Sequence, residues 1–345
     1  MGASAAEHAA MKRALELAQA PGTPLGPNPR VGCVLLNASG ETVAEGRHRG
    51  AGTPHAEVDA LERAGTRARG STAVVTLEPC NHTGRTGPCV QALVVAGVAR
   101  VVFAQTDPNP VAAGGAAALT AAGVDVLEGL LADEARVVNR VWSFAADHGR
   151  PFVTWKLATT LDGRSAAADG SSRWVTSAAA RRDVHRLRAV CDVVLAGTGT
   201  VFADDPELTV RDADGHPAAH QPMRAVMGVR ELPKDLRVFD DAAQTVVLPT
   251  HDPGEAVDTL YHLDRQHVLL EGGPTLAAAF LRAGLVDEVV AYVAPALLGA
   301  GTPAVADLGI GTIADIVRLD LREVSTVGTG AESCVRMIAS LKAEA

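Results

Sequence analysis

The sequence has few aromatic residues, a shortage of basic relative to acidic residues, and no long apolar run. Phe, Trp and Tyr make up 3% of its 345 residues, while 47% are hydrophobic, which favours aliphatic cores in α/β layers over aromatic-rich sandwiches. No stretch reaches the ~18 uncharged apolar residues that a membrane-spanning helix requires. The formal net charge of −9 disfavours a broad phosphate-binding surface and therefore nucleic-acid partners.

Cysteine is also scarce, and its positions form no compact disulfide framework: Cys33, Cys80, Cys89, Cys191 and Cys334. Such usage is typical of a reducing compartment. Charged residues between Glu7 and Arg13 interrupt the start of the chain, so it lacks the apolar centre of a secretory signal. We therefore expect a cytoplasmic protein.

The length of the chain predicts two domains, because 345 residues exceed the usual domain size of about 150. The polar turn at residues 147–150, directly before Pro151, is the best linker candidate. This places one domain at residues 1–147 and the other at residues 151–345. Strand and helix patterns alternate along the chain, which predicts α/β domains with mainly parallel sheets.

Local patterns in the first half predict several elements. Ser4 and Glu7 have the spacing of a capping box, so a helix should begin there. An apolar strand is expected over residues 73–78, and Cys80 soon after it stands where a helix could begin and favour a thiolate. A single further helix is expected over residues 131–146.

Three potential soft metal ligands follow one another at His55, Cys80 and Cys89. An imidazole and two thiolates suit Zn²⁺, and three protein ligands leave one tetrahedral position open for water, as in catalytic zinc sites. Glu57 is not needed as a ligand, so it could move a proton from water to a leaving amine. These residue types in this order predict a zinc-dependent hydrolytic deaminase.

Two other interpretations of these residues stay open. General zinc deaminases carry the pattern P-C-x-x-C, whereas eight residues separate Cys80 from Cys89 here. A structural zinc site would need a fourth ligand, for which Cys33 is the upstream candidate. Alternatively, the two cysteines are buried thiols that bind no metal.

The second half contains a strand that ends in two glycines. In residues 268–275, Gly272 and Gly273 follow an apolar run, and Pro274 suits the first position of a helix. Free N–H groups at such a helix start bind phosphate, although a tight turn without a ligand explains the pattern equally well. Residues 213–222 are rich in turn formers and are expected on the surface, with their two histidines in solvent.

These motifs make the chain resemble the bifunctional deaminase/reductase family of riboflavin biosynthesis over almost its whole length. In the first half they are GPNPRVG at 26–32, PHAE at 54–57, LEPC at 77–80, GRTGPC at 84–89 and DPNP at 107–110. In the second half they are KLATTLDGR at 156–164, WVTS at 174–177, ADDPELTVR at 203–211 and EGGPTL at 271–276. The resemblance implies a cytidine-deaminase-like α/β/α domain followed by a dihydrofolate-reductase-like α/β domain.

The resemblance also implies two consecutive reactions. The first removes the 2-amino group of 2,5-diamino-6-(ribosylamino)-4-pyrimidinone 5'-phosphate by means of Zn²⁺ and Glu57. The second reduces the ribosyl group to ribityl with NADPH. The expected partners are small pyrimidine nucleotides, with neither nucleic acid nor membrane, and we expect a homo-oligomer, either a dimer or a tetramer.

The same resemblance assigns roles to particular residues. Contacts to the deaminase substrate are implied for Asn28, His48, His82 and Arg85. Contacts to NADPH are implied for Ala158, Trp174, Thr200, Asp204, Gly273, Pro274, Thr275, Leu276, Ala277, Ala278 and Ala279. Contacts to the reductase substrate are implied for Ser172, Arg188, Leu208, Arg211 and Glu271. Lys156 and Asp204 are the candidates for orienting or protonating the opened sugar.

Plainer explanations stay open for three of these residues: Arg85 as a solvated loop residue, Lys156 as a lysine reaching out from a strand end, and Trp174 as part of the core. For the whole chain, one rival hypothesis is a base deaminase acting on tRNA or single-stranded DNA, which the acidic, aromatic-poor composition disfavours. Another rival is a binding protein that keeps the zinc fold without activity, but such a protein would not need Glu57.

Two places depart from the family pattern. Gly228-Val229 stand where the family often carries an Asp-Ser pair that touches the cofactor, so a polar contact to NADPH is missing or replaced. If one of the two domains is inactive, this departure points to the reductase. Gly26 stands where a histidine is common in the family, and this difference affects only a detail of a loop.

Overall fold

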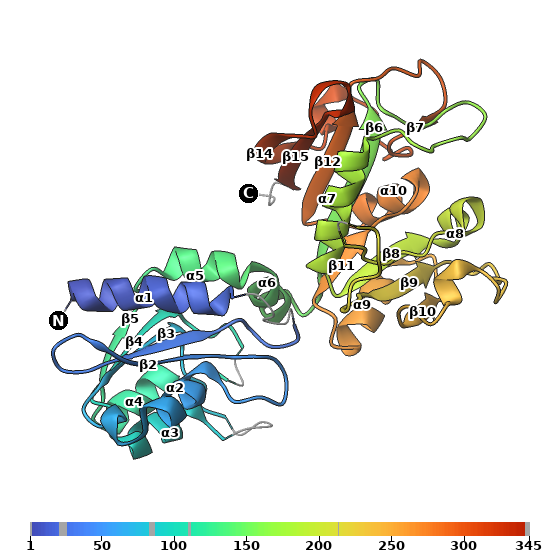
Figure 1. Cartoon of the computed structure of the whole chain (residues 1–345). Coiled ribbons are helices and arrows are strands. Elements are labelled where there is room, and N and C mark those ends of the chain that lie inside the picture. Colours follow the sequence, from blue (N-terminus) through green and yellow to red (C-terminus); the bar gives the residue numbers. More distant parts are fainter. Residues whose placement is uncertain (1, 21–25, 83–86, 110–111, 213, 342–345) are drawn as a thin grey trace. The chain divides into compact units, whose positions relative to one another are not determined.

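A computed structural model describes residues 2–20, 26–82, 87–109, 112–212 and 214–341 of the chain. The chain divides into two compact units, Met1–Gly149 and Arg150–Ala345, coloured from blue to green and from green to red in Figure 1. Each unit has its own sheet and its own core. Among the described residues, no helix is both long enough and apolar enough to cross a membrane.

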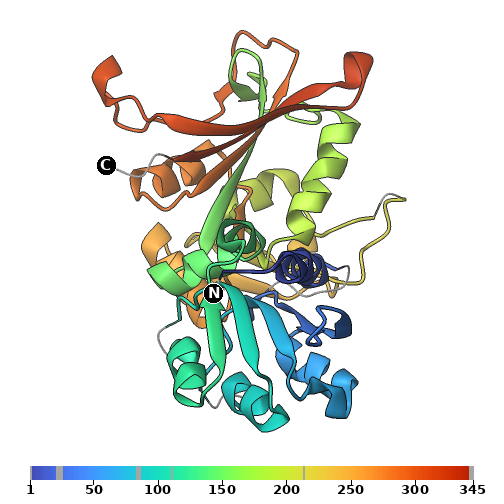
Figure 2. The ribbon, with the colours of Figure 1, turned by 90° about the vertical axis from the view of Figure 1, so that its left-hand side faces the viewer.

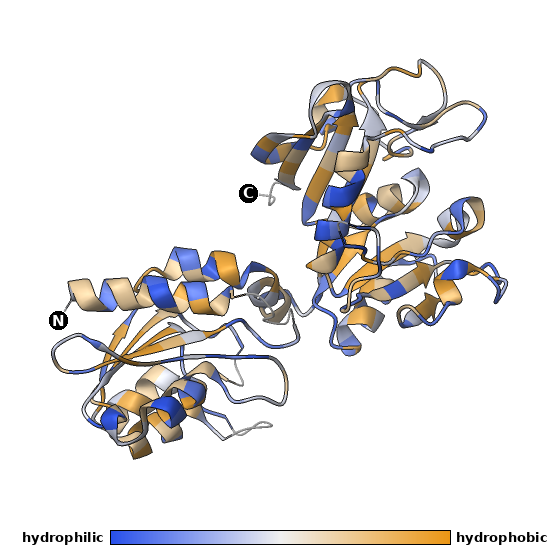
Figure 3. Ribbon diagram, in the orientation of Figure 1, coloured by the Kyte–Doolittle hydropathy of each residue, from blue (hydrophilic) through white to orange (hydrophobic). Residues whose placement is uncertain are grey.

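The first unit is built on a five-stranded sheet in the order β2-β1-β3-β4-β5. β1 pairs antiparallel with β2 and β3, whereas β3, β4 and β5 run parallel. The strands are β1 (Gly32–Leu36), β2 (Thr42–Arg47), β3 (Thr72–Leu77), β4 (Arg100–Gln105) and β5 (Asp125–Glu128). Figure 3 shows the middle strands as hydrophobic, which fits a sheet covered on both faces.

Helices pack on both faces of this sheet (Figures 1 and 2). They are α1 (Ala5–Ala18), α2 (Ala56–Ala64), α3 (Cys89–Ala96), α4 (Gly115–Ala121), α5 (Ala132–Val138) and α6 (Arg140–His148). α1 and α5 share one core with the strands, and α2, α3 and α4 share the other. Ser4 and Glu7 form the predicted capping box of α1. The α/β/α prediction is therefore confirmed.

Two expectations about helices are wrong. The helix expected over residues 131–146 is divided into α5 and α6 at Asn139. The side chain of Asn139 pairs with the backbone of Arg30 through hydrogen bonds of 2.8 and 2.9 Å. Cys80 begins no helix, because it lies in the loop after β3, and α3 begins at Cys89 instead.

The second unit contains an eight-stranded sheet in the order β10-β9-β8-β11-β6-β12-β15-β14. The strands from β10 to β12 in this order are parallel, and β15 and β14 extend the edge antiparallel. The strands are β6 (Phe152–Thr160), β8 (Val193–Gly197), β9 (Met223–Met227), β10 (Thr245–Leu248), β11 (His267–Leu270), β12 (Glu288–Ala294), β14 (Leu319–Val327) and β15 (Cys334–Leu341). A separate small sheet pairs β7 (Arg164–Ala166) with β13 (Thr302–Pro303).

Helices also cover both faces of the second sheet: α7 (Ala178–Ala189), α8 (Thr198–Asp204), α9 (Pro253–His262) and α10 (Pro274–Arg282). α9 and α10 pack on one face, while α7 and α8 cover the other. Side chains alternate along β6, so Trp155 joins the core under α9 and α10 while Lys156 faces the side of α7. Lys156 thus lies in mid-strand rather than at a strand end. Trp174 is 66% exposed, so the idea that it belongs to the core is wrong.

α4 approaches the loop after β3 so closely that residue 115 must be glycine. A Cβ atom on Gly115 would lie 1.8 Å from the carbonyl oxygen of Pro79, which is far inside van der Waals contact. The position of the loop that carries Cys80 therefore depends on the missing side chain at Gly115.

We expect the substitution Gly115→Ala to destabilise the first unit by about 1–3 kcal/mol, the usual cost of overpacking. Gly87→Ala is the matched control, because a Cβ atom on Gly87 meets nothing within 4 Å, and its effect should stay within about 0.5 kcal/mol. Differential scanning calorimetry measures both changes. Equal melting temperatures for the two variants would contradict the tight contact at Gly115.

Candidate active sites

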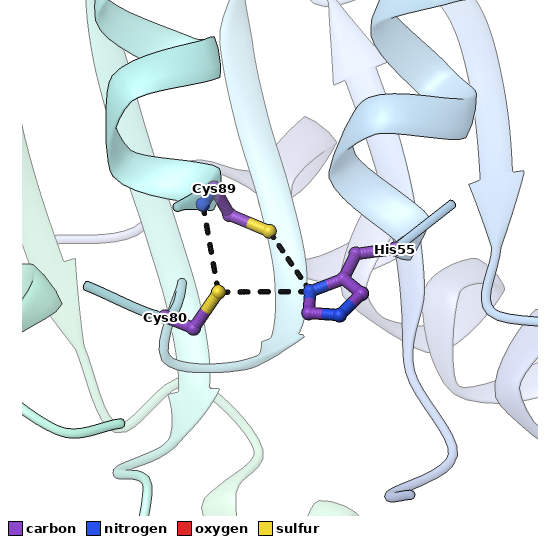
Figure 4. Close-up of side chains that lie close together, drawn as sticks. All are labelled: His55, Cys80 and Cys89. Atoms are coloured by element: carbon purple, nitrogen blue, oxygen red, sulfur yellow. Dashed lines mark hydrogen bonds between the residues drawn. The ribbon is translucent and has the colours of Figure 1, made fainter. Parts of the chain in front are cut away.

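Three potential metal ligands converge at one end of the first sheet (Figure 4). His55 is the N-cap residue of α2 and has extended backbone angles, φ −67° and ψ 161°. Cys80 lies in the loop after β3, and Cys89 is the first residue of α3. Because His55 precedes the helix while Glu57 lies in its first turn, both side chains reach the same site, which two residues in mid-helix at this spacing would not do.

The ligand atoms are separated as in a tetrahedral zinc site. The Nδ1 atom of His55 lies 3.2 Å from Sγ of Cys89 and 3.6 Å from Sγ of Cys80. Tetrahedral bonds of ~2.0 Å to nitrogen and ~2.3 Å to sulfur would place such atoms about 3.5 Å apart. Both the donor types and their spacing therefore fit Zn²⁺. Cys33 is buried in β1 and is not in this cluster, so the described residues offer three ligands, as a catalytic site requires.

Burial and hydrogen bonding set the protonation of the groups around this cluster. A hydrogen bond with the Cys89 thiol lowers the pKa of Cys80 to about 4, and a hydrogen bond with His55 acts in the same direction. The lowered pKa favours the thiolate form of Cys80, the form in which a cysteine binds a metal. Glu57 is 4% exposed, and burial raises the pKa of its carboxyl group. A raised pKa suits a carboxyl group that takes up a proton and releases it again.

Glu78 holds the loop that carries Cys80, a role that sequence analysis did not identify. Its carboxylate accepts hydrogen bonds from the N–H groups of Ala116, at 2.9 Å, and Asp107, at 3.2 Å. These bonds tie the loops after β3 and β4 to the start of α4. The only sequence signal for Glu78 was its place in the LEPC motif.

Asn28 and His48 form a hydrogen-bonded chain beside the metal cluster. Nδ1 of His48 donates to the carbonyl group of Pro54 at 3.1 Å, so Nε2 accepts from the side-chain amide of Asn28 at 2.9 Å. The rings of His48 and His55 meet edge to face, with their centroids 5.4 Å apart. This chain fixes the orientation of the Asn28 amide next to the metal cluster.

The loop between the two cysteines carries His82 and Arg85. Nδ1 of His82 is buried and has no hydrogen-bond partner among the residues that the structure describes. Arg85 lies outside the described residues. A hollow of about 490 Å³ opens beside His55, between the starts of α2 and α3, and it is lined by residues 52–55, 58, 87–88, 91–92 and 95.

In the second unit a buried ion pair joins α7 to the end of β11. Nε and Nη2 of Arg188 donate to the two carboxylate oxygens of Glu271 at 2.6 and 3.0 Å, and Nη1 donates to the carbonyl group of Thr209 at 2.7 Å. Burial alone would raise the pKa of Glu271, but Arg188 and Lys156 lower it, so this carboxylate stays charged. Burial lowers the pKa of Lys156, although Glu271 opposes the shift.

The other residues assigned to the reductase substrate lie before α7 and after α8. Leu208 has a positive φ of 53° and is 3% exposed. The guanidinium of Arg211 donates to the Glu207 carboxylate and, at 3.0 Å, to the carbonyl group of Gly215. Ser172 lies in the loop that precedes α7. The Thr209 carbonyl bonded to Arg188 brings the segment of Leu208 and Arg211 to the ion pair.

The residues assigned to NADPH follow three neighbouring parallel strands. Ala158 lies near the end of β6, Thr200 lies in α8 directly after β8, and α10 follows β11 and begins after Gly273. A Cβ atom on Gly273 would lie 3.5 Å from Oγ1 of Thr200, so α8 and the start of α10 lie against each other. The run from 273 to 279 therefore forms the start of α10 beside Thr200.

Trp174 and Asp204 lie on the surface of the second unit with arginines around them. The Arg181 guanidinium lies 4.4 Å from the centroid of the Trp174 ring, close enough for a cation–π contact. Arg173 donates to the carbonyl oxygen of Asp204, and its guanidinium lies 3.8 Å from the Asp204 carboxylate. The exposed Trp174 ring is thus held in place without being part of a core.

The departure at Gly228 has a structural counterpart in Thr198. Gly228 follows β9 with φ 138°, and a Cβ atom there would lie 2.6 Å from Oγ1 of Thr198. The side chain of Thr198 therefore fills the space that a side chain at position 228 would need. The Thr198 hydroxyl group therefore lies beside Gly228, where the family often carries a polar side chain.

Comparisons with known proteins match each of the two units to a family model. Residues 4–105 match the cytidine and deoxycytidylate deaminase zinc-binding region, and residues 151–332 match the RibD C-terminal domain. The chain is 52% identical to riboflavin biosynthesis protein RibD of Mycobacterium tuberculosis over 303 residues, which is 88% of this chain and 89% of that protein.

Two solved structures are similar over nearly the whole chain. RibD of Acinetobacter baumannii has a TM-score of 0.89 at 37% identity, and covers 98% of this chain and 99% of its own. A Thermotoga maritima protein has a TM-score of 0.85 at 31% identity, with coverage of 98% and 99%. That protein is named as a diaminohydroxyphosphoribosylaminopyrimidine deaminase and 5-amino-6-(5-phosphoribosylamino)uracil reductase.

We expect the purified protein to contain about one zinc ion per chain, because the described residues offer one three-ligand site of His and Cys. Cys89→Ser should weaken zinc binding by more than about tenfold, since even residues that only support metal ligands are worth that much. Cys33→Ser is the control, because Cys33 is also buried but lies outside the cluster. Metal analysis by mass spectrometry measures the content, and full zinc retention in Cys89→Ser would contradict the site.

Proposed function

The chain belongs to the RibD family of bifunctional riboflavin biosynthesis proteins, and from this premise we propose which of its residues carry the two activities. The chain joins a zinc-dependent deaminase to an NADPH-dependent reductase. We assign the deaminase to residues 1–147 and the reductase to residues 151–345. We further propose that the chain acts on the two pyrimidine phosphates for which the Thermotoga protein is named, with deamination first.

The observation that carries the deaminase assignment is the three-ligand cluster with a buried carboxyl group beside it. A zinc ion held by His55, Cys80 and Cys89 would supply Lewis-acid activation of water at the ring carbon that bears the amino group. Glu57 takes up the proton of the attacking water and delivers it to the departing ammonia. Its raised pKa supports both halves of this transfer.

Polar side chains around the cluster would orient the pyrimidine phosphate. The amide of Asn28 is fixed by its hydrogen bond to His48, which supports its role as a contact to the ring. His82 offers a buried Nδ1 atom that no described residue uses. Arg85 is proposed to bind the phosphate, because a guanidinium forks onto phosphate oxygens.

In the second unit, the charged groups at the end of β11 would hold the sugar. NADPH supplies the hydride that reduces C1' of the ribosyl group. Arg188 and Glu271 form a rigid pair that can hydrogen-bond the opened sugar together with Arg211, Ser172 and Leu208. Lys156 faces this pair, and the lowered pKa supports a role in giving up a proton to the sugar oxygen. Asp204 is the second candidate for orienting or protonating the sugar.

The cofactor assignment is supported by the start of α10. The first N–H groups of a helix have no partner within it and attract phosphate, and Pro274 at the first position fixes the turn. Thr200 lies against this turn, and the exposed ring of Trp174 offers a flat surface. We propose that these residues, with Ala158 and the remainder of the run 273–279, bind NADPH.

A coupled assay that follows ammonia and NADPH together tests both activities. We expect Glu57→Gln to keep its zinc but to lower ammonia release by at least about 100-fold, the lower range of general acid–base catalysis. With the undeaminated substrate, this variant should also stop oxidising NADPH. Supplying the deaminated substrate to the same variant should restore NADPH loss, because the reductase residues are unchanged.

Two results would contradict the proposal. Normal ammonia release by Glu57→Gln would remove the role of Glu57. Rapid NADPH oxidation by Glu57→Gln with the undeaminated substrate would overturn the order of the reactions. Zinc analysis of the variant provides the control, because a protein that has lost its metal would be inactive for another reason.

We also propose a cytoplasmic location. All five cysteines are free thiols, which supports a reducing compartment. Cell fractionation tests this proposal, and recovery of the protein outside the cytoplasm would contradict it.

A homo-oligomer formed through the reductase is a further part of the proposal. β14 ends the sheet, is nine residues long, and exposes 61% of Leu321 and 56% of Val324. The outer edge of an end strand carries backbone groups that can pair with another chain. A second copy of the chain is the partner that we propose for this edge.

We expect light scattering of the purified protein to give the mass of a dimer or a tetramer. Leu321→Lys should reduce that mass, because a lysine on an edge strand opposes pairing. Val137→Lys on α5 is the control, since Val137 is 75% exposed in the first unit, and it should leave the mass unchanged. A monomer mass for the unaltered protein would rule the proposal out.

A further inference from the structure

The segment of residues 208–211 follows α8 and belongs to no named helix or strand, and side chains of α7 bind one edge of its backbone. The Thr209 carbonyl accepts from Nη1 of Arg188 at 2.7 Å. The N–H of Arg211 donates to Nδ1 of His185 at 3.2 Å. His185 and Arg188 are three residues apart and therefore lie on the same face of α7. Together they take the place of a neighbouring strand.

The other edge of the same segment is bound by Gln221. The N–H of Val210 donates to the side-chain oxygen of Gln221 at 2.7 Å, and the Gln221 amide donates to the Val210 carbonyl at 2.9 Å. Leu208, Thr209 and Val210 are each at most 4% exposed. The backbone is thus fixed on both edges up to Arg211, the residue assigned to the substrate at the end of the segment.

His185 can accept the hydrogen bond from Arg211 only while its Nδ1 atom is unprotonated. Burial lowers the pKa of His185, and the Arg188 guanidinium lowers it further. The Arg211 charge acts in the same direction, whereas the Glu271 carboxylate and the Thr209 backbone oppose the shift. The imidazole is therefore neutral at neutral pH and keeps its acceptor.

We propose that His185 is a positioning residue of the reductase, whose neutral Nδ1 atom holds the Arg211 backbone so that Arg211 meets the substrate. This inference rests on the proposed function, because it takes Arg211 as a substrate contact. His185 itself takes no part in the chemical step. Its loss affects binding of the ribosyl substrate, while binding of NADPH and the chemical step stay unchanged.

Two variants distinguish the effect of the hydrogen-bond acceptor on His185 from the effect of its side-chain volume. His185→Asn keeps an amide oxygen near the position of Nδ1, whereas His185→Leu fills similar space without an acceptor. In the full-length, zinc-loaded protein, His185→Leu should weaken binding of 5-amino-6-(5-phosphoribosylamino)uracil about fivefold, the scale of one lost hydrogen bond. His185→Asn should restore most of this loss. Titration calorimetry in the presence of NADP⁺ measures the affinity without turnover.

Kinetics provide the second readout. His185→Leu should raise KM for the ribosyl substrate with kcat within about twofold, the pattern expected when binding and not chemistry is lost. The Kd of NADPH should be the same in all three proteins. Equal substrate affinity in wild type and His185→Leu, or equal weakening in both variants, would overturn the proposal. A fall in kcat without a change in KM would also overturn it.

The pH dependence decides the matter if His185→Leu does not fold. As pH falls below the ordinary histidine pKa of ~6.5, protonation of Nδ1 in the wild type should weaken substrate binding more steeply than in His185→Asn, which does not titrate. The phosphate of the substrate titrates equally in both measurements. Parallel profiles would overturn the proposal. Failure of the wild type to oxidise NADPH would instead count against the proposed function.

Discussion

Both sites depend on one geometric constraint, which is that parallel strands deliver the loops that follow them to the same edge of a sheet. In the first unit the loops after β3 and β4 meet at this edge, and Glu78 joins them through the N–H groups of Asp107 and Ala116. In the second unit β8, β11 and β6 are neighbours, so Thr200 after β8 and Gly273 after β11, both proposed to bind NADPH, lie at the same edge of the sheet. The strand order therefore decides which loops meet at each candidate site.

Within that frame, neighbouring charges give two buried glutamates opposite properties. Burial raises the pKa of Glu57 despite the nearby His55. Glu271 is also buried, yet Arg188 and Lys156 lower its pKa. One carboxyl group can therefore exchange a proton, while the other remains a fixed anion that holds Arg188. The two candidate sites thus contain the same residue type in opposite electrostatic settings.

The sequence indicated the α/β class, most strands and the three candidate metal ligands, because periodicity and ligand type are local properties. It misplaced the helix start, since a Pro-Cys pair occurs both at Cys80 and at Cys89, and the close packing of Gly115 against Pro79 depends on tertiary contacts. It also missed the break at Asn139, whose partner Arg30 lies 109 residues away. The reductase residues came from family resemblance, because the Arg188 pairing depends on tertiary contacts.

The two units share a device that no local pattern reveals. Asn139 binds both backbone groups of Arg30, and Gln221 binds both backbone groups of Val210. A side-chain amide carries one acceptor and two donors, so it can replace the hydrogen bonds of a neighbouring strand. Each amide fixes a segment that carries proposed substrate residues, Asn28 in one case and Arg211 in the other. The side-chain amide satisfies the backbone N–H and C=O groups of the loop, so the loop needs no neighbouring strand. The end of the loop is then not covered by such a strand and can meet a ligand.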